Sequence, residues 1–153
     1  MIRNARMADL PAIHALITLF AEQGLMLFRS PTELYESVRS FLVYEKDGRV
    51  VGCCALDVLW KDMAEVRSLA VDPACHGEGV GSKLVHVAIE EARRLGISRV
   101  LSLTYRQSFF ERLGFNVVPR TALPHKVWTA CVGCPKKDCC DEIPMLYEGE
   151  HDE

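Results

Sequence analysis

The stretch from residue 69 to residue 82, Leu-Ala-Val-Asp-Pro-Ala-Cys-His-Gly-Glu-Gly-Val-Gly-Ser, constrains the fold of this chain most. A short apolar run ends at Asp72-Pro73, a glycine-rich turn follows, and an amphipathic helix begins directly after it. Gly77, Gly79 and Gly81 lack Cβ atoms, so the backbone can bring its N–H groups close to a ligand. The positive end of the helix dipole lies at the same place and suits a diphosphate. We therefore expect a cradle for a nucleotide-bearing cofactor at this turn.

The spacing of the glycines excludes two common nucleotide-binding motifs. A P-loop needs Lys and then Ser or Thr after its last glycine, whereas Gly81 is followed by Ser82-Lys83. A dinucleotide fingerprint spaces its glycines by two and then three, whereas these glycines are evenly spaced and follow several strands. A strand-to-helix turn that binds no ligand is the alternative interpretation.

Length, charge and cysteine usage limit the class of protein. The chain has 153 residues, enough for one domain with a real core, and a formal net charge of -3. It offers no basic field for nucleic acid and no apolar run long enough to cross a bilayer, so we expect neither partner. The N-terminus lacks the pattern of a secretory signal, and seven cysteines do not form a secreted disulfide framework. These features favour a cytoplasmic protein.

Apolar spacing and turn signals predict alternating helices and strands. Asp9 is expected to cap a helix that runs to Gly24, and Ser30-Pro31 to open a second, short helix. Asp47-Gly48 is a strong hairpin signal between two strands. The later elements are a strand at 64–71, a helix lined by Leu84, Ala88, Ala92 and Leu95, a strand at 99–103, a helix at 108–113 and a strand at 115–118. Antiparallel strands followed by a βαβ-like half predict a mixed α/β fold.

Three segments, in this order, resemble the GNAT superfamily of N-acetyltransferases. His76-Gly77-Glu78-Gly79-Val80-Gly81 resembles the acyl-CoA-binding motif of that family, Gln/Arg-x-x-Gly-x-Gly/Ala, with His in place of Gln or Arg. Residues 66–73 resemble the family's fourth strand and its exit, and residues 109–115 resemble its F(Y/F)xxxGF element. The resemblance covers residues 1–120 and implies a mostly antiparallel, splayed sheet flanked by helices. We expect residues 121–153 to be a C-terminal extension of the same domain.

The resemblance implies acetyl-CoA as co-substrate and N-acetyl transfer as the reaction. It assigns acetyl-CoA binding to the end of the strand and to the turn, namely Leu69, Ala70, Val71, His76, Gly77, Glu78, Gly79, Val80, Gly81 and Ser82. Main-chain N–H groups between Ser68 and Val71 are expected to stabilise the oxyanion on the acetyl carbonyl. His76 is either a phosphate donor, weaker than Arg at neutral pH, or a simple turn residue.

Glu65 is the predicted general base. An amine must lose its proton before it attacks a thioester, and an amino group with a pKa of about 8 is mostly protonated at neutral pH. A carboxylate can take that proton directly or through a water molecule. The resemblance implies a glutamate with this role on this strand. A solvated or salt-bridged carboxylate beside Arg67 is the alternative.

The resemblance also implies a tyrosine that protonates the leaving thiolate. Its usual position is occupied here by Phe110, which has no proton to give. Tyr105 and Ser108 are the candidate replacements. Tyr105 is otherwise a surface residue, and Ser108 is otherwise the N-cap of the helix that follows. A thiolate with a pKa of about 8.5 can also leave without an acid.

The segment from Gly24 to Ser30, together with the tail segments 123–128, 131–135 and 140–142, resembles single-domain bacterial N-acetylglutamate synthases. This resemblance implies L-glutamate as acceptor, a place in arginine biosynthesis and, as in many members, a homodimer. Two carboxylates need cationic partners, and Arg is the best bidentate partner. Arg29 is the first candidate, and Arg67 and Lys126 are the next. An ordinary surface arginine is the alternative for Arg29.

Four cysteines lie close together in the tail, namely Cys131, Cys134, Cys139 and Cys140. With His125 they offer ligands of the kind zinc binds, but a second pair at normal spacing is missing. We favour free thiols packed in a compact tail, with zinc or a redox pair as alternatives. Cys53, Cys54 and Cys75 are expected to be core or turn residues.

The favoured function is direct transfer of an acetyl group from acetyl-CoA to the α-amino group of L-glutamate. Acetylation of another small amine or of a protein amino group is the first alternative. A non-catalytic acyl-CoA sensor is the second, because the usual tyrosine is absent, and a metal-binding interaction module built on the cysteine tail is the third.

Overall fold

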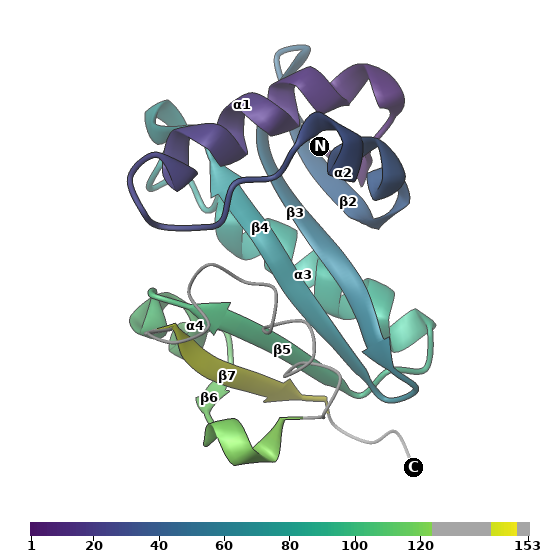
Figure 1. Ribbon diagram of the computed structural model, residues 1–153, viewed down its shortest axis with the longest axis vertical. Helices are drawn as coiled ribbons and strands as arrows, with labels where there is room; N and C mark the ends of the chain where they lie inside the picture. The colour runs from purple at the N-terminus through teal and green to yellow at the C-terminus, as the bar shows by residue number, and fades with distance from the viewer. Residues whose placement is uncertain (124–141, 150–153) are drawn as a thin grey trace. The chain divides into compact units, whose positions relative to one another are not determined.

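The computed structural model describes residues 1–123 and 142–149 (Figure 1). Its helices and strands are, in chain order, β1 (Ile2–Asn4), α1 (Leu10–Ala21), α2 (Pro31–Glu36), β2 (Phe41–Lys46), β3 (Arg49–Trp60), β4 (Met63–Val71), α3 (Val80–Arg94), β5 (Arg99–Thr104), α4 (Gln107–Arg112), β6 (Asn116–Val117) and β7 (Ile143–Glu148). Short 3-10 turns lie at Met7–Asp9, Val38–Ser40, Pro73–Cys75 and Arg120–Ala122. Among the described residues, no helix combines the length and the apolar character needed to cross a membrane.

The strands form one seven-stranded sheet in the order β1-β2-β3-β4-β5-β7-β6. The β1–β2, β2–β3, β5–β7 and β6–β7 pairs are antiparallel, and the β4–β5 pair is parallel. The predicted mixed and mostly antiparallel α/β fold is therefore confirmed. The chain divides into two compact units, which we call unit 1 (Met1–Asp57 with Val66–Glu91) and unit 2 (Val58–Glu65 with Ala92–Glu153).

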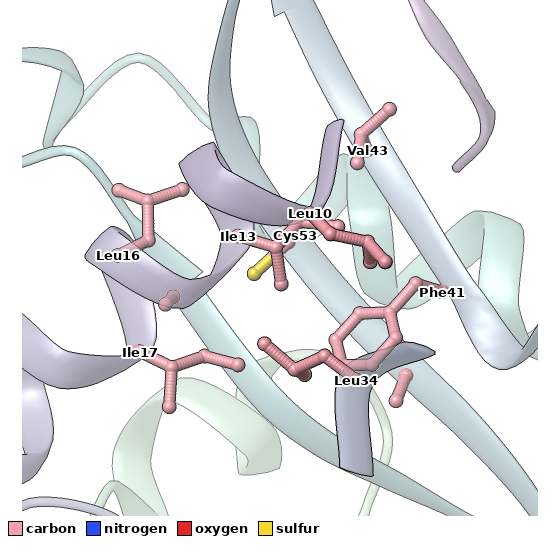
Figure 2. Close-up of a cluster of buried hydrophobic side chains, with 10 residues drawn as sticks. Leu10, Ile13, Leu16, Ile17, Leu34, Phe41, Val43 and Cys53 are labelled. Carbon is pink, nitrogen blue, oxygen red and sulfur yellow. The ribbon is translucent and has the colours of Figure 1, made fainter. Parts of the chain in front are cut away.

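In unit 1, helices cover both faces of β3. Cys53 lies in a buried cluster with residues of α1 and α2 (Figure 2), whereas the thiol of the next residue, Cys54, lies 3.8 Å from the Leu84 carbonyl of α3. Successive residues of a strand point to opposite faces, so α1 and α2 cover one face and α3 covers the other (Figure 1). The α1 side holds a buried cluster made of Leu10, Ile13, Leu16, Ile17, Leu34, Phe41, Val43, Cys53, Ala55 and Ala70.

In unit 2, β5 pairs with the first residues of β4 on one side and with β7 on the other. A buried cluster of this unit consists of Met63, Leu101, Leu123 and Leu146. β7 lies beyond residue 120, so the predicted C-terminal extension supplies a strand of the sheet.

Two local signals are confirmed by the structure. Asp47 and Gly48 both have positive φ values, 54° and 73°, as a tight type I′ hairpin turn requires. Ser30 caps α2, because its hydroxyl accepts the N–H of Glu33 at 3.2 Å. The predictions for Cys53, Cys54 and Cys75 are confirmed as well, since all three are buried.

The predictions for Asp9 and Leu95 are wrong. The Asp9 carboxylate makes no cap for α1 and instead accepts the Arg6 N–H at 2.7 Å and two bonds from the Arg3 guanidinium, at 2.7 and 3.0 Å. A charged tertiary partner is thus preferred over the helix terminus. Leu95 is 57% exposed because α3 ends at Arg94, one residue before it.

Gly52 of β3 is a close-approach position, and the substitution Gly52→Ala tests it. A Cβ atom there would lie 2.9 Å from Val80 Cγ1 and 3.1 Å from Leu84 Cδ1 of α3. We expect Gly52→Ala to lower the free energy of unfolding by about 1 to 2 kcal/mol, measured by urea denaturation. In a Val80→Ala background the same change should cost less, because the space is then open. Equal costs in both backgrounds would contradict this account of the packing.

Candidate active site

The predicted cofactor turn leaves β4 in unit 1 and is held by its own side chains. Asp72 opens the 3-10 turn, and its carboxylate accepts the Ala74 N–H at 2.9 Å. Gly77 and Gly79 have φ values of 85° and 79°, and a Cβ atom at either would have no neighbour within 4 Å. Both glycines are therefore needed for backbone conformation, and both face open space from which a ligand can approach.

The turn ends at the N-terminus of α3. The hydrogen bond from the Lys83 N–H to the Gly79 carbonyl, at 3.1 Å, spans four residues as in a helix. The N–H groups of Val80, Gly81 and Ser82 therefore precede the helical ladder, at the positive end of a 15-residue helix. This arrangement can bind a diphosphate through main-chain groups.

His76 has internal partners. Its Nε2 lies 2.9 Å from the Val71 carbonyl oxygen, and its ring stacks on Phe20 with centroids 6.2 Å apart. Because a carbonyl only accepts, Nε2 carries the proton in this contact. A neutral ring then has no second N–H for a phosphate, so a donor role requires the imidazolium.

Glu78 places a carboxylate in the predicted diphosphate cradle, and Lys46 of β2 neutralises it. The Lys46 ammonium donates to the Glu78 carboxylate at 2.7 Å. This contact lowers the pKa of Glu78 and raises the pKa of Lys46. The pair joins residues 32 positions apart, and nothing in the local sequence indicates it.

The ion pair predicts a specific effect on cofactor binding. We expect Lys46→Met to raise the KM for acetyl-CoA about two- to fivefold, because the uncompensated Glu78 then repels the diphosphate. The double variant with Glu78→Gln should regain the wild-type KM in steady-state assays. A double variant as weak as Lys46→Met would show instead that Lys46 itself contacts the cofactor.

Arg29 lies in unit 1 between the end of α2 and β4. Its Nη1 and Nη2 donate to the hydroxyls of Ser68 and Ser37, each at 3.3 Å, and its guanidinium lies over the Phe41 ring at 5.4 Å. The Glu33 carboxylate is 3.7 Å from Nε, and only 9% of the Arg29 side chain is exposed. The alternative of an ordinary surface arginine is therefore wrong for Arg29.

Arg67 is the second predicted acceptor cation in unit 1. Its guanidinium donates to Asp57 of β3 at 3.3 Å. Burial lowers the pKa of Arg29, and the positive charge of Arg67 lowers it further. The structure thus brings Arg29 and Arg67 close enough to interact, with Asp57 and Glu33 as partial counter-charges.

The predicted catalytic residues Glu65, Tyr105 and Ser108 lie in unit 2. Glu65 is half-buried and pairs in register with Leu101 of β5. Tyr105 follows the end of β5, about 13 Å along the strand from Leu101. Ser108 lies inside α4, whose N-cap is Arg106, so its prediction as a helix cap is wrong. Thr104 instead accepts the Arg106 N–H, at 2.8 Å.

Phe110 occupies the position of the missing tyrosine and is a core residue. It is buried, and its ring makes edge contacts with Phe109 and Phe115, each with centroids 5.0 Å apart. The Phe115 ring in turn lies 5.5 Å from that of Tyr147. A hydroxyl at residue 110 would lie within apolar packing, which accounts for Phe at this position.

The remaining predicted residues lie outside the described part of the chain. These are Lys126 and the metal candidates Cys131, Cys134, Cys139 and Cys140, together with His125. Within residues 1–123 and 142–149, no group of three or more His, Cys, Asp or Glu side chains is arranged to hold a metal ion.

A cavity of about 440 Å³ lies in unit 1 beside the first turns of α3, lined by Met1, Ile2, Tyr44, Ser82, Lys83, His86 and Val87. Of the predicted site residues that the structure describes, only Ser82 lines it. The other predicted site residues of unit 1 lie at the turn after β4 and around the buried side chain of Arg29.

The comparisons agree with the geometry. Residues 9–115 match the profile of the Acetyltransferase (GNAT) family. The amino-acid acetyltransferase of Mycobacterium tuberculosis is 40% identical over 131 residues, which cover 84% of this chain and 75% of that protein. A crystal structure of a Mycobacterium tuberculosis protein with CoA and a second ligand has a TM-score of 0.85 and 35% identity, and covers 97% of this chain and 98% of that one.

A second solved structure is the N-acetylglutamate synthase of Neisseria gonorrhoeae, complexed with coenzyme A and N-acetyl-glutamate. It has a TM-score of 0.88 and 30% identity, and the match covers 99% of this chain and 35% of that chain. The resemblance found in the three sequence segments is thereby confirmed over most of the chain. The chain belongs to the acetyltransferase (GNAT) family and is an N-acetyltransferase.

Proposed function

We propose that this enzyme transfers the acetyl group of acetyl-CoA to the α-amino group of L-glutamate. The observation that carries the proposal is the buried Arg29 guanidinium beside a second cation, Arg67. The two positive charges repel each other, which raises the free energy of the empty site. A bound dianion attracts both guanidinium groups and offsets this repulsion. The pair therefore favours an acceptor with two carboxylates over an acceptor with one.

The relatives support the same acceptor. One is named an amino-acid acetyltransferase, and another was solved with coenzyme A and N-acetyl-glutamate. A small amino acid is the acceptor class, and glutamate is the member whose charges suit both arginines. Lys126, a homodimer, a cytoplasmic location and a role in arginine biosynthesis belong to the same proposal. So does a single domain with residues 1–120 as its core and residues 121–153 as its extension.

Acetyl-CoA is the acetyl donor, and the turn after β4 holds its diphosphate. The main-chain N–H groups of Val80, Gly81 and Ser82 are the binding groups, supported by the dipole of α3. Leu69, Ala70 and Val71 offer strand-edge groups for the rest of the cofactor.

Glu65 takes a proton from the α-ammonium group of the acceptor. The neutral nitrogen attacks the carbonyl carbon of the thioester, the C–S bond breaks, and main-chain N–H groups between Ser68 and Val71 stabilise the oxyanion. The thiolate leaves as such or takes a proton from Tyr105 or Ser108.

The test is thiol release from acetyl-CoA with a panel of acceptors. The panel includes L-glutamate, L-aspartate, neutral and basic amino acids, a polyamine and a peptide with a free N-terminus. Turnover that depends on L-glutamate, with N-acetylglutamate identified by mass spectrometry, supports the proposal. Turnover only with a polyamine or with the peptide would overturn the assignment of the acceptor.

A further inference from the structure

Ser68 has an unusual backbone conformation in the middle of β4. Its φ value is 54°, in the left-handed region, and among the described residues Asp47 is the other non-glycine residue with a positive φ. Asp47 lies in a hairpin turn, where this conformation is expected. Serine adopts this conformation in a strand only at a cost in free energy. Such strained residues persist where the surrounding structure holds them, and they are common at functional sites.

The left-handed turn at Ser68 changes which side chains of β4 face α1 and α2. Arg67 contacts Asp57 of β3. Asp57 follows Cys53 and Ala55 at intervals of two residues, so it lies on the same face of β3 as these two members of the α1-side cluster. Ala70 belongs to that same cluster, although it is three residues from Arg67. A regular strand would alternate every two residues. The irregularity at Ser68 therefore places Arg67 and Ala70 on the same face of β4, the face toward α1 and α2.

The Ser68 hydroxyl accepts a hydrogen bond from Arg29, the residue that binds the acceptor in our proposed function. Arg29 donates to Ser68 at 3.3 Å and to Ser37 at 3.3 Å, and both contacts are long for charged hydrogen bonds. Arg29 Nε is buried and makes no hydrogen bond within the part of the chain that the structure describes, and the mostly exposed Glu33 carboxylate lies 3.7 Å from it as an ion-pair partner. The guanidinium is thus held in place and still has capacity for a carboxylate.

The Ser68 main chain is held from the other side. The Cys53 thiol donates to the Ser68 carbonyl at 3.5 Å. Burial raises the pKa of Cys53 to about 12, so the thiol keeps the proton that it donates. Ser68 is therefore fixed at its carbonyl by β3 and at its hydroxyl by Arg29.

We propose that Ser68 is a positioning residue that sets the acceptor amino acid in register with the acetyl group. Its hydroxyl locates the Arg29 guanidinium, and its main chain begins the strand segment that faces the thioester. This inference rests on the proposed function of Arg29. It adds that the Ser68 side chain links Arg29, which binds a carboxylate of the acceptor, to β4, the strand that faces the thioester.

The test compares four substitutions in steady-state kinetics. Ser68→Ala removes the hydroxyl and keeps the Cβ atom, so we expect the KM for the acceptor to rise about tenfold and kcat to fall about tenfold. The KM for acetyl-CoA should change less than about twofold. Ser68→Gly should give the same kinetics with a higher melting temperature, because glycine removes the backbone cost. Ser68→Thr keeps a hydroxyl but puts a β-branched side chain in the left-handed region, so it should recover only part of kcat and should lower the melting temperature.

Ser37→Ala is the matched control, because it removes the other hydroxyl from Arg29 and leaves β4 unchanged. It should raise the KM for the acceptor and leave kcat near the wild-type value. The proposal fails if Ser68→Gly leaves both constants unchanged, or changes the KM values for acceptor and acetyl-CoA by the same factor. Ser68→Gly decides the result even where Ser68→Ala does not fold.

The wild-type enzyme is assayed with L-glutamate first. If it acetylates another amino acid instead, the proposed function fails, and the Ser68 variants are then measured with that amino acid. The two failures are therefore distinct.

Discussion

Replacing Glu65 with Gln is expected to lower kcat/KM for acetylation of the acceptor by about 10²- to 10⁴-fold at neutral pH. Gln has the shape of Glu but cannot accept the proton of the α-ammonium group. Only the fraction of acceptor that is already neutral can then react. The deficit should shrink as the pH rises through the pKa of the acceptor amine, and rates of thiol release across neutral and alkaline pH measure this change.

Asp62→Asn is the control for the Glu65 variant. Asp62 also lies in unit 2, pairs with Arg99 at 3.2 Å and has a side chain that is 44% exposed. Its neutral variant should keep the wild-type kcat/KM at every pH. A Glu65→Gln profile that matched the wild type at every pH would assign Glu65 to a structural ion pair instead.

Replacing Arg29 with Ala is expected to raise the KM for L-glutamate about 100-fold, with little change in the KM for acetyl-CoA. The variant loses the charged hydrogen bonds to one carboxylate and leaves that carboxylate without its partner. The protein should remain folded, because the substitution also removes a buried positive charge near Arg67. Initial-rate measurements with each substrate varied in turn give both constants.

Arg39→Ala is the matched control for Arg29. Arg39 follows α2 and is exposed, so its loss should leave both KM values unchanged. Arg29→Lys should recover only part of the affinity, since an ammonium cannot bind a carboxylate through two parallel bonds. Equal increases in both KM values for Arg29→Ala would remove Arg29 from the acceptor site.

The features that could be predicted from the sequence depend on local chemistry. The hairpin at Asp47-Gly48 and the cap at Ser30 each depend on neighbouring residues, and the structure confirms both. The glycine-rich turn is also local, because Gly77 and Gly79 supply the positive φ values that only glycine adopts readily. The prediction of Arg29 as an acceptor residue comes from the likeness of its segment to a known acceptor loop, and its role in acceptor binding is part of our proposal.

The features that could not be predicted depend on contacts between distant residues. Asp9 fits the pattern of a helix cap, but an ion pair with Arg3 competes for its carboxylate. Lys46 meets Glu78 across 32 residues of sequence. No residue pattern marks the left-handed conformation of Ser68, because serine is common in ordinary strands. Tertiary packing imposes each of these arrangements.

The ratio of kcat/KM for L-glutamate to that for L-glutamine tests the central claim most directly. The two acceptors have the same shape and differ by one carboxylate, so the ratio isolates the second charge that Arg29 and Arg67 are proposed to recognise. We predict that glutamate is preferred by about 100-fold, and that Arg29→Ala reduces this preference. A ratio of one or less in the wild-type enzyme would contradict recognition of a dicarboxylate by these two arginines.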